Sequence, residues 1–345
     1  MPRAVVLLGD SKVEVRDVAK PTPESGEILV KVHAAGLNPT DWKHALTKNE
    51  KFFGAVSGCD FAGVVEAIGP DVPAGLRTVG ERVAGIVHGS NVLRPSVGAF
   101  AEYLVVPATL VFTVPESVSL EVAAAQGVAA ITTAQMLWQS QSLPTPDAPG
   151  DKTAFFLVWS GATGVGQWLI QLAHQSGLRV VTTASLKHTE RLKALGAEVV
   201  FDYRDPEVAK KIREYTGGKL TSGGICEIKA EDIDTPVAAL SDEGGILSVI
   251  NFLPAKEYPK PVKFPLSLAY HIFGKAIASP VTTAALPHVY EASVGYYKLI
   301  SRLLAEGKVE LVPVRVFGGL ESVSDGFAEM REGRVSGERI VFKIL

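Results

Sequence analysis

Residues 1–125 alternate short apolar runs with glycine and proline. Runs of this length, rich in β-branched residues and bounded by turn residues, are typical of strands. A helix is expected near the end of the region, over about 119–138, with Ser119 as its N-cap. The pattern therefore predicts a compact β-rich domain. The expected strands are 4–8, 13–15, 28–34, 63–68, 80–85 and 99–106.

The pattern changes after a proline-rich connector at 143–150, which is expected to be a surface loop. Residues 153–159 form a continuous apolar run, typical of a strand buried on both faces. Strands and helices then alternate, which indicates parallel pairing with right-handed crossovers. The sequence therefore predicts an α/β, doubly wound sheet. Its expected strands are 153–159, 179–183, 198–201, 224–228 and 245–251, and its expected helices are 164–175, 188–195 and 206–215.

The tail at 312–345 returns to β character around one short helix, expected at 321–331. Because the tail resembles the first region, we expect the chain to return and complete the first domain. The predicted division assigns residues 1–125 and 309–345 to the β-rich catalytic domain, and 126–308 to a cofactor domain.

A phosphate-binding loop is expected at 158–166, where the sequence reads VWSGATGVG. A buried strand ends here and a helix begins, so small residues let the backbone approach a pyrophosphate. The helix N-terminus then offers free N–H groups to the phosphates. The spacing is Gly161-x-x-Gly164-x-Gly166, which departs from the strict dinucleotide fingerprint.

The end of the second strand of this sheet indicates which dinucleotide binds. An NAD site places a carboxylate here to accept from the ribose hydroxyls, whereas this chain has Ser185, Lys187 and His188. These groups can donate to a 2′-phosphate, so NADPH is favoured over NADH. Lys187 alone could also be a solvated residue at a helix start. Tyr203 could contact the adenine or the phosphate, or could pack at the sheet edge.

Composition narrows the function classes. Lys and Arg number 34 and Asp and Glu 37, so a partner held by bulk positive charge, such as nucleic acid, is not expected. The two cysteines, Cys59 and Cys226, cannot build a disulfide scaffold or a four-cysteine zinc site. No apolar run reaches the roughly 20 residues of a membrane span, and no signal peptide is evident. We expect a cytoplasmic protein.

Four further segments carry a resemblance: GLNPTDWK at 36–43, GCDFAGVV at 58–65, VGERV at 79–83 and GAFAEY at 98–103. With the phosphate loop, they make the chain similar to the medium-chain dehydrogenase/reductase superfamily. The resemblance implies a GroES-like β-rich domain and a Rossmann cofactor domain. Zinc-bearing members have Cys where this chain has Asn38, and His-Glu where it has Cys59 and Asp60. We therefore expect no metal, and we expect Cys59 to be a small buried packing residue.

Within the zinc-independent branch, the chain most resembles fungal trans-acting enoyl reductases of polyketide synthases. The matching features are DWK at 41–43, the connector, FDYR at 201–204, YHIFG at 270–274 and the closing 333–338 segment. One departure is Ser160, where many relatives have glycine. The cofactor-binding residues expected from the motifs and the resemblance are Thr40, Asp41, Trp42, Lys43, Ala162, Thr163, Gly164, Val165, Ser185, Lys187, His188, Tyr203, Ile250, Asn251, Ser336 and Gly337. The expected substrate-lining residues are Ala129, Thr133, Met136, Tyr270, His271, Ile272, Phe273 and Gly274.

The resemblance implies NADPH-dependent reduction of an α,β-unsaturated thioester on the carrier protein of a partner polyketide synthase, in secondary-metabolite biosynthesis. Lys43 is the first catalytic candidate, either positioning the nicotinamide ribose or lying near the enolate oxygen. Thr132 is the second, able to bind cofactor or substrate, or to bond back within its helix. His271 could face the substrate or be structural.

Two other functions stay open at this stage: a quinone or enone oxidoreductase, and a non-catalytic accessory protein that binds the carrier. Four prolines at 254–265 make the segment after the last expected strand a poor edge for pairing, which favours a monomer.

Overall fold

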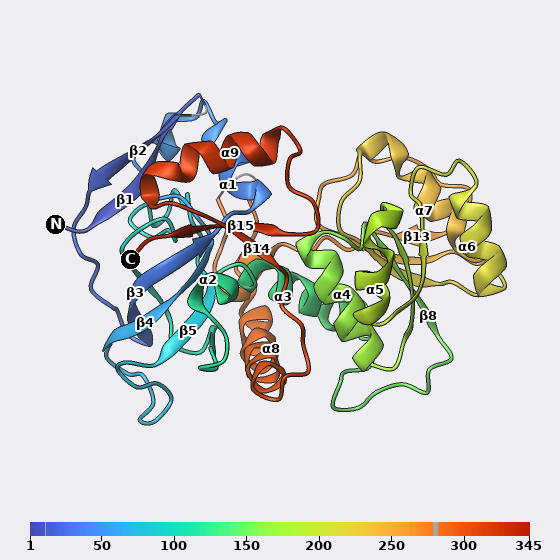
Figure 1. Cartoon of the computed structure of the whole chain (residues 1–345), viewed down its shortest axis with the longest axis horizontal. Coiled ribbons are helices and arrows are strands. Elements are labelled where there is room, and N and C mark those ends of the chain that lie inside the picture. Colours follow the sequence, from blue (N-terminus) through green and yellow to red (C-terminus); the bar gives the residue numbers. More distant parts are fainter. Residues whose placement is uncertain (11, 279–281) are drawn as a thin grey trace. The chain divides into compact units, whose positions relative to one another are not determined.

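The computed structural model describes residues 1–10, 12–278 and 282–345, and its internal contacts divide the chain into two compact units (Figure 1). The first unit comprises Met1–Val128 and Tyr270–Leu345, and the second comprises Ala129–Ala269. None of the described helices is long and apolar enough to cross a membrane.

Six parallel strands form the sheet of the second unit. Their spatial order is β10-β9-β8-β11-β12-β13, which is the Rossmann order with its topological switch between β8 and β11. The predicted doubly wound sheet is therefore confirmed. The strands are β8 (Phe155–Trp159), β9 (Arg179–Thr183), β10 (Ala197–Phe201), β11 (Ser222–Ile225), β12 (Gly245–Val249) and β13 (Val262–Lys263).

Helices cover both faces of this sheet. Phe155, Leu157 and Trp159, alternate residues of β8, share an apolar cluster with Ile212 and Val237 of two following helices. The opposite face meets the helix after β8, as expected for a buried parallel sheet. The helices are α4 (Gly164–Gln175), α5 (Thr189–Ala194), α6 (Val208–Thr216) and α7 (Asp234–Ala239), with 3₁₀ turns at Leu186–His188 and Ala230–Asp232.

The first unit is built on a bent, mostly antiparallel sheet. β3 (Glu27–Gly36) lies at its centre and pairs with β4 (Asp60–Ile68) on one side. On the other side, its first half pairs with β6 (Tyr103–Pro107) and its second half with β15 (Arg339–Lys343). The tail of the chain therefore belongs to this sheet. β5 (Arg82–Ile86), β7 (Val111–Thr113) and β14 (Val314–Phe317) complete the sheet. β1 (Arg3–Gly9) and β2 (Lys12–Asp17) pair with each other in a separate two-stranded sheet.

Several helical segments differ from the expectation. The helix expected over 119–138 is divided into α2 (Leu120–Ala123), α3 (Gly127–Ala134) and a π-helical turn, Gln135–Gln139. Ser119 does cap α2, since its side chain accepts from the Val122 N–H. The other helical segments are α1 (Pro39–Ala45), α8 (Pro287–Ala305), α9 (Val323–Arg331) and 3₁₀ turns at Glu50–Phe52, Ala269–Phe273 and Leu320–Ser322. The sequence did not predict α1, α7, α8 or the turns at Glu50–Phe52 and Ala269–Phe273.

Residues 270–308 group with the first unit, although the sequence assigned them to the cofactor domain. The physical reason is the packing of α8. Its Tyr297 is buried and stacks on Phe112 of β7, with ring centroids 6.3 Å apart. Its Tyr290 hydroxyl lies 2.8 Å from the Thr109 hydroxyl.

Candidate functional site

The loop between β8 and α4 begins with an unusual backbone. Ser160 has φ +67°, a left-handed conformation that costs an L-residue roughly 1–2 kcal/mol. Two bonds hold it: its N–H donates to the Thr183 Oγ1 at 3.0 Å, and its Oγ donates to the Glu227 carbonyl at 2.7 Å. The departure noted in the sequence therefore has a structural explanation, because glycine adopts this φ freely.

Two glycines of the loop are required by close approach. A Cβ on Gly161 would lie 2.2 Å from the Thr182 Oγ1, and one on Gly166 would lie 2.5 Å from the Ser160 carbonyl oxygen. Thr163 caps α4, with its Oγ1 accepting from the Gly166 N–H at 3.0 Å. The loop is thus tightly folded, and the predicted residues Ala162, Thr163, Gly164 and Val165 are partly exposed, as is Ser160.

The carboxyl ends of β9 and β10 lie side by side, since the strands pair in parallel with Phe201 opposite Thr183. Ser185 is half-buried and Lys187 is exposed after β9, and Tyr203 is 51% exposed after β10. The carboxylate at this edge, Asp202, is bound to Arg204, which lowers its pKa to about 2. Cationic and hydroxyl groups therefore surround this end of the sheet. Burial and the Lys187 charge lower the pKa of His188.

Three features fit a dinucleotide phosphate: a loop whose glycines leave no room for a Cβ, the N-terminus of α4 behind it, and an Asp202 carboxylate that is paired with Arg204. Ile250 and Asn251 follow β12 at the same edge of the sheet and are half-buried. The structure thus brings together the cofactor residues predicted for the second unit along one sheet edge.

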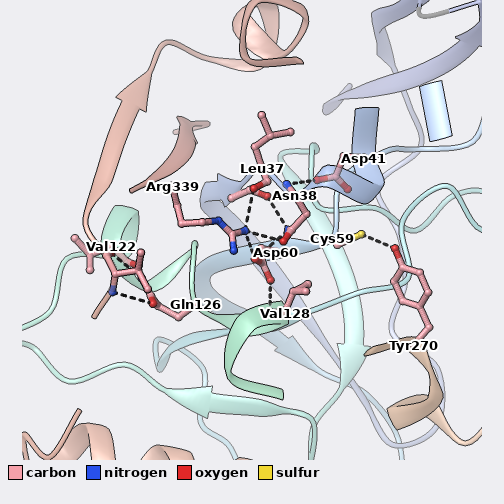
Figure 2. A network of polar contacts seen from close by, with 12 residues as sticks. Leu37, Asn38, Asp41, Cys59, Asp60, Val122, Gln126, Val128, Tyr270 and Arg339 are labelled. Carbon is pink, nitrogen blue, oxygen red and sulfur yellow. Dashed lines mark hydrogen bonds and ion pairs between the residues drawn. The ribbon is translucent and has the colours of Figure 1, made fainter. Parts of the chain in front are cut away.

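The first unit contains a buried polar network centred on Asp60, at the start of β4 (Figure 2). The Asp60 Oδ1 accepts from the Val128 N–H at 2.6 Å, and its Oδ2 accepts from the Asn38 Nδ2 at 3.0 Å and the Arg339 Nη2 at 3.1 Å. Arg339 also donates to the Asn38 Oδ1 at 2.7 Å and to the Leu37 carbonyl at 2.9 Å. One carboxylate therefore links α1, α3 and β15. Burial raises the pKa of Asp60 to about 6, although Arg339 opposes the shift.

A second chain of polar groups adjoins this network. The Asn38 N–H donates to the Asp41 Oδ2 at 2.7 Å, while the Asp41 Oδ1 is buried without a hydrogen-bond partner. The Cys59 thiol lies 2.9 Å from the Tyr270 hydroxyl (Figure 2). The same hydroxyl is 3.4 Å from the Thr40 Oγ1. Burial raises the pKa of Asp41 to about 7 and holds the pKa values of Cys59 and Tyr270 above their usual ranges.

The other predicted residues of the first unit lie in different settings. Lys43 is exposed on α1, with its Nζ 5.8 Å from the Trp42 ring centroid. Ser336 is exposed and Gly337 has φ +75° in the segment before β15. Of the substrate-lining set, Ile272 is fully buried, Phe273 is half-buried, Gly274 has φ +64°, and the His271 Nε2 lies 3.1 Å from the Thr283 Oγ1.

In the second unit, Ala129, Thr132, Thr133 and Met136 are all buried on α3 and the π-helical turn. The Thr133 Oγ1 donates weakly to the Val165 carbonyl at 3.4 Å, which places it beside the start of α4. Met136 points at the sheet, since a Cβ on Gly224 would lie 3.3 Å from its Cε. Thr133 therefore contacts the phosphate loop directly.

Two family models match the chain. Residues 24–116 match the alcohol dehydrogenase GroES-like domain, and residues 164–281 match the zinc-binding dehydrogenase family. The trans-enoyl reductase ACTTS2 of Alternaria alternata is 36% identical over 99% of this chain and 98% of its own length. The trans-enoyl reductase caaB of Aspergillus niger is 36% identical over 99% of this chain and 96% of its own length.

The chain belongs to the trans-enoyl reductases, within the medium-chain dehydrogenase/reductase superfamily. Solved structures agree on the fold. The CurK enoyl reductase superimposes with a TM-score of 0.79 at 20% identity, covering 100% of this chain and 99% of the other. Mycobacterial Rv1454c, solved in complex with NADPH, superimposes with a TM-score of 0.75 at 25% identity, covering 99% of this chain and 100% of the other. The predicted family and fold class are confirmed.

Zinc does not fit this trans-enoyl reductase at Asn38, Cys59 and Asp60, the positions that correspond to zinc ligands in zinc-bearing members. Both functional groups of the Asn38 amide are engaged by Asp60 and Arg339, and an amide is a poor zinc ligand. The buried guanidinium of Arg339 brings positive charge to the same carboxylate. In the described part of the chain, no three His, Cys, Asp or Glu side chains are grouped to hold a metal ion.

Two residues of the network, Asp60 and Arg339, were not among the predicted site residues of this trans-enoyl reductase. They are 279 positions apart in the sequence and 3.1 Å apart in the fold. Asp60 lies in the segment 58–65, where zinc-bearing members have Glu at the same position. This shared carboxylate could have marked Asp60 as a site residue. Arg339 carried no such signal, because its role depends on the pairing of β15 with β3.

Proposed function

We propose that this chain is an NADPH-dependent enoyl reductase that reduces the C=C bond of an α,β-unsaturated thioester carried by a partner polyketide synthase. The observation that carries the proposal is the near full-length similarity to trans-enoyl reductases at 36% identity. The loop between β8 and α4 supports it, because its close-packed glycines suit a dinucleotide pyrophosphate.

Reduction of a conjugated C=C bond needs three things from the protein. It must orient the cofactor, stabilise charge on the thioester oxygen and admit a proton. Bound NADPH supplies a hydride for the β-carbon. We assign the exposed ammonium of Lys43 to positioning the cofactor or the enolate oxygen, and the buried Thr132 hydroxyl to a hydrogen bond with cofactor or substrate.

We assign the preference for NADPH to the β9 end of the sheet. Ser185, Lys187 and His188 offer donors for a 2′-phosphate, and the carboxylate of Asp202 is neutralised by Arg204. The NADPH complex of mycobacterial Rv1454c is consistent with a cofactor of this class. Thr40, Asp41, Trp42, Ser336 and Gly337 remain predicted cofactor residues of the first unit.

Steady-state turnover tests the proposal. NADPH oxidation is followed with crotonyl pantetheine, with a quinone and with a simple enone, and each reaction is repeated with NADH. We expect the highest kcat/KM for the enoyl thioester with NADPH. Turnover of the quinone alone would establish a quinone reductase instead. Absence of NADPH binding in a fluorescence titration would favour a non-catalytic accessory protein.

A further inference from the structure

Four side chains of the first unit, each with an exchangeable proton, follow one another in a line. The proposed function assigns no proton-transfer role to them. Asp41 and Cys59 are buried at its inner end, while Thr40 and Tyr270 are half-buried at its outer end. The Cys59 thiol is 2.9 Å from the Tyr270 hydroxyl and also interacts with the Asp41 carboxyl. Each member carries, or can carry, a proton on an oxygen or sulfur atom.

The inner end carries an unmet polar group. The Asp41 Oδ2 accepts from the Asn38 N–H, but its Oδ1 is buried without a hydrogen-bond partner. A buried carboxylate oxygen that accepts no hydrogen bond destabilises the folded protein. If Oδ1 is protonated instead, it becomes a donor and needs an acceptor beside it. The Cys59 sulfur is the neighbour able to accept.

We propose that Tyr270, supplied through Cys59 from Asp41, is the proton donor of the reduction. The inference rests on the proposed function. Hydride addition at the β-carbon moves the C=C electron pair onto the thioester as an enolate. The α-carbon then forms a C–H bond as the Tyr270 O–H bond breaks. Tyr270 takes the Cys59 proton, Cys59 takes the Asp41 proton, and the Asp41 carboxylate is reprotonated from water.

The environment of the line suits a concerted shift. Burial holds the pKa values of Tyr270 and Cys59 above their usual ranges, so neither is expected to persist as an anion. Asp41 can hold the resulting charge, because its pKa of about 7 lies near the working pH. Asp60 faces it and raises that pKa, while Arg339 lowers it. His88 stacks on the Tyr270 ring at 3.8 Å, but burial lowers its pKa to about 3, so it is neutral and cannot be the acid.

Removal of single links tests the line. Tyr270→Phe and Cys59→Ala should each lower kcat for crotonyl pantetheine at least about tenfold, because general acids typically contribute 10²–10⁴-fold. Cys59→Ser should keep most of the wild-type kcat, since a hydroxyl can pass a proton as the thiol does. The dissociation constant for NADPH should not change in any of them. Tyr258→Phe, which removes a buried hydroxyl without a partner in the second unit, is the matched control.

The pH profile and a spectrum address Asp41. As an acid, Asp41 acts while protonated, so the wild-type kcat should fall as pH rises through about 7. Asp41→Asn should be slow and should lack that limb. Without any substrate, the infrared spectrum of the wild type should show a protonated-carboxyl C=O band that fades as pH rises through about 7, and Asp41→Asn should lose that part of the band.

Several results would overturn the proposal. A wild-type kcat in Tyr270→Phe would exclude Tyr270 as the proton donor. Equal losses of kcat in Cys59→Ser and Cys59→Ala would mean that Cys59 contributes by packing of its sulfur atom and not by passing a proton. An unchanged pH profile in Asp41→Asn excludes the reservoir. Failure of the wild type itself to reduce the thioester contradicts the proposed function instead, so the two failures are distinct.

Discussion

Ser160 concentrates the backbone strain of the phosphate loop in one residue. It keeps a left-handed φ of +67° while its Oγ bonds to the Glu227 carbonyl. Ser160→Ala keeps the strain and loses the bond, so we expect the free energy of unfolding to fall by about 1 kcal/mol. Ser160→Gly loses the bond but also relieves strain of roughly 1–2 kcal/mol. Urea unfolding should therefore rank the glycine variant above the alanine variant, and the reverse order would contradict the strain.

Lys187 is the residue through which NADPH can be told from NADH. It is exposed after β9, where a 2′-phosphate would meet its ammonium. Lys187→Ala should raise the dissociation constant for NADPH at least about tenfold, because a hydrogen bond to a charged group is worth about 1.5–3 kcal/mol. The constant for NADH should not change. Lys193→Ala, an exposed lysine on α5, is the matched control; equal losses for both cofactors would refute the assignment.

Local sequence predicts the positions of candidate site residues in the fold only where a strand end places them. Ser185 and Lys187 follow β9, and parallel strands present their carboxyl ends at one edge, so their position follows from order along the chain. Arg339 reaches Asp60 only because β15 pairs with β3. That contact depends on tertiary pairing, which no local pattern contains.

At the scale of elements, the entry into α3 is crowded. A Cβ on Gly127 would lie 2.6 Å from the Gly85 carbonyl oxygen and 2.8 Å from the Asp60 Oδ1. Gly127→Ala should therefore lower the free energy of unfolding by about 2 kcal/mol or more, as overpacking against backbone does. Gly295→Ala is the matched control, because Gly295 is exposed within α8 and a methyl group there would meet nothing within 4 Å. It should gain about 0.5–1 kcal/mol from helix propensity. Thermal unfolding of both variants measures the contrast, and similar losses would contradict it.

Helices and strands were predicted from the sequence where the apolar positions recur regularly and where glycines or polar residues mark both ends. Residues 164–175 and 179–183 coincide with α4 and β9 because a loop glycine and a short apolar run delimit them. The helix α8 has buried residues at Val289, Ser293, Tyr297, Ile300 and Leu304, a 3.6-residue period that was a usable signal. The helix expected over 119–138 is interrupted between Ala123 and Gly127, where the Gln126 side chain donates to the Val312 carbonyl of the tail.

At the scale of the molecule, the second unit is one continuous segment inserted into the first. The chain leaves the first unit after Val128 and returns at Tyr270. Both ends of the inserted segment thus adjoin residues of the polar networks: Val128 donates to Asp60, and Tyr270 contacts Cys59. The networks therefore hold in place Val128 and Tyr270, the two residues of the first unit between which the second unit is inserted.

One of the two edges of the Rossmann sheet, the β13 edge, sets our expectation for assembly. β13 forms that edge, is two residues long and pairs only with Gly245 and Ile246 among the described residues. Prolines at 254, 259, 261 and 265 remove N–H donors around it, and an edge without donors is a poor template for a second sheet. We predict a monomer, so light scattering during size exclusion should give 36.6 kDa at all concentrations. A mass of two chains would contradict this. In that case Val262→Pro tests where the two chains meet: loss of the dimer would place the contact at β13, and an unaffected dimer would place it elsewhere.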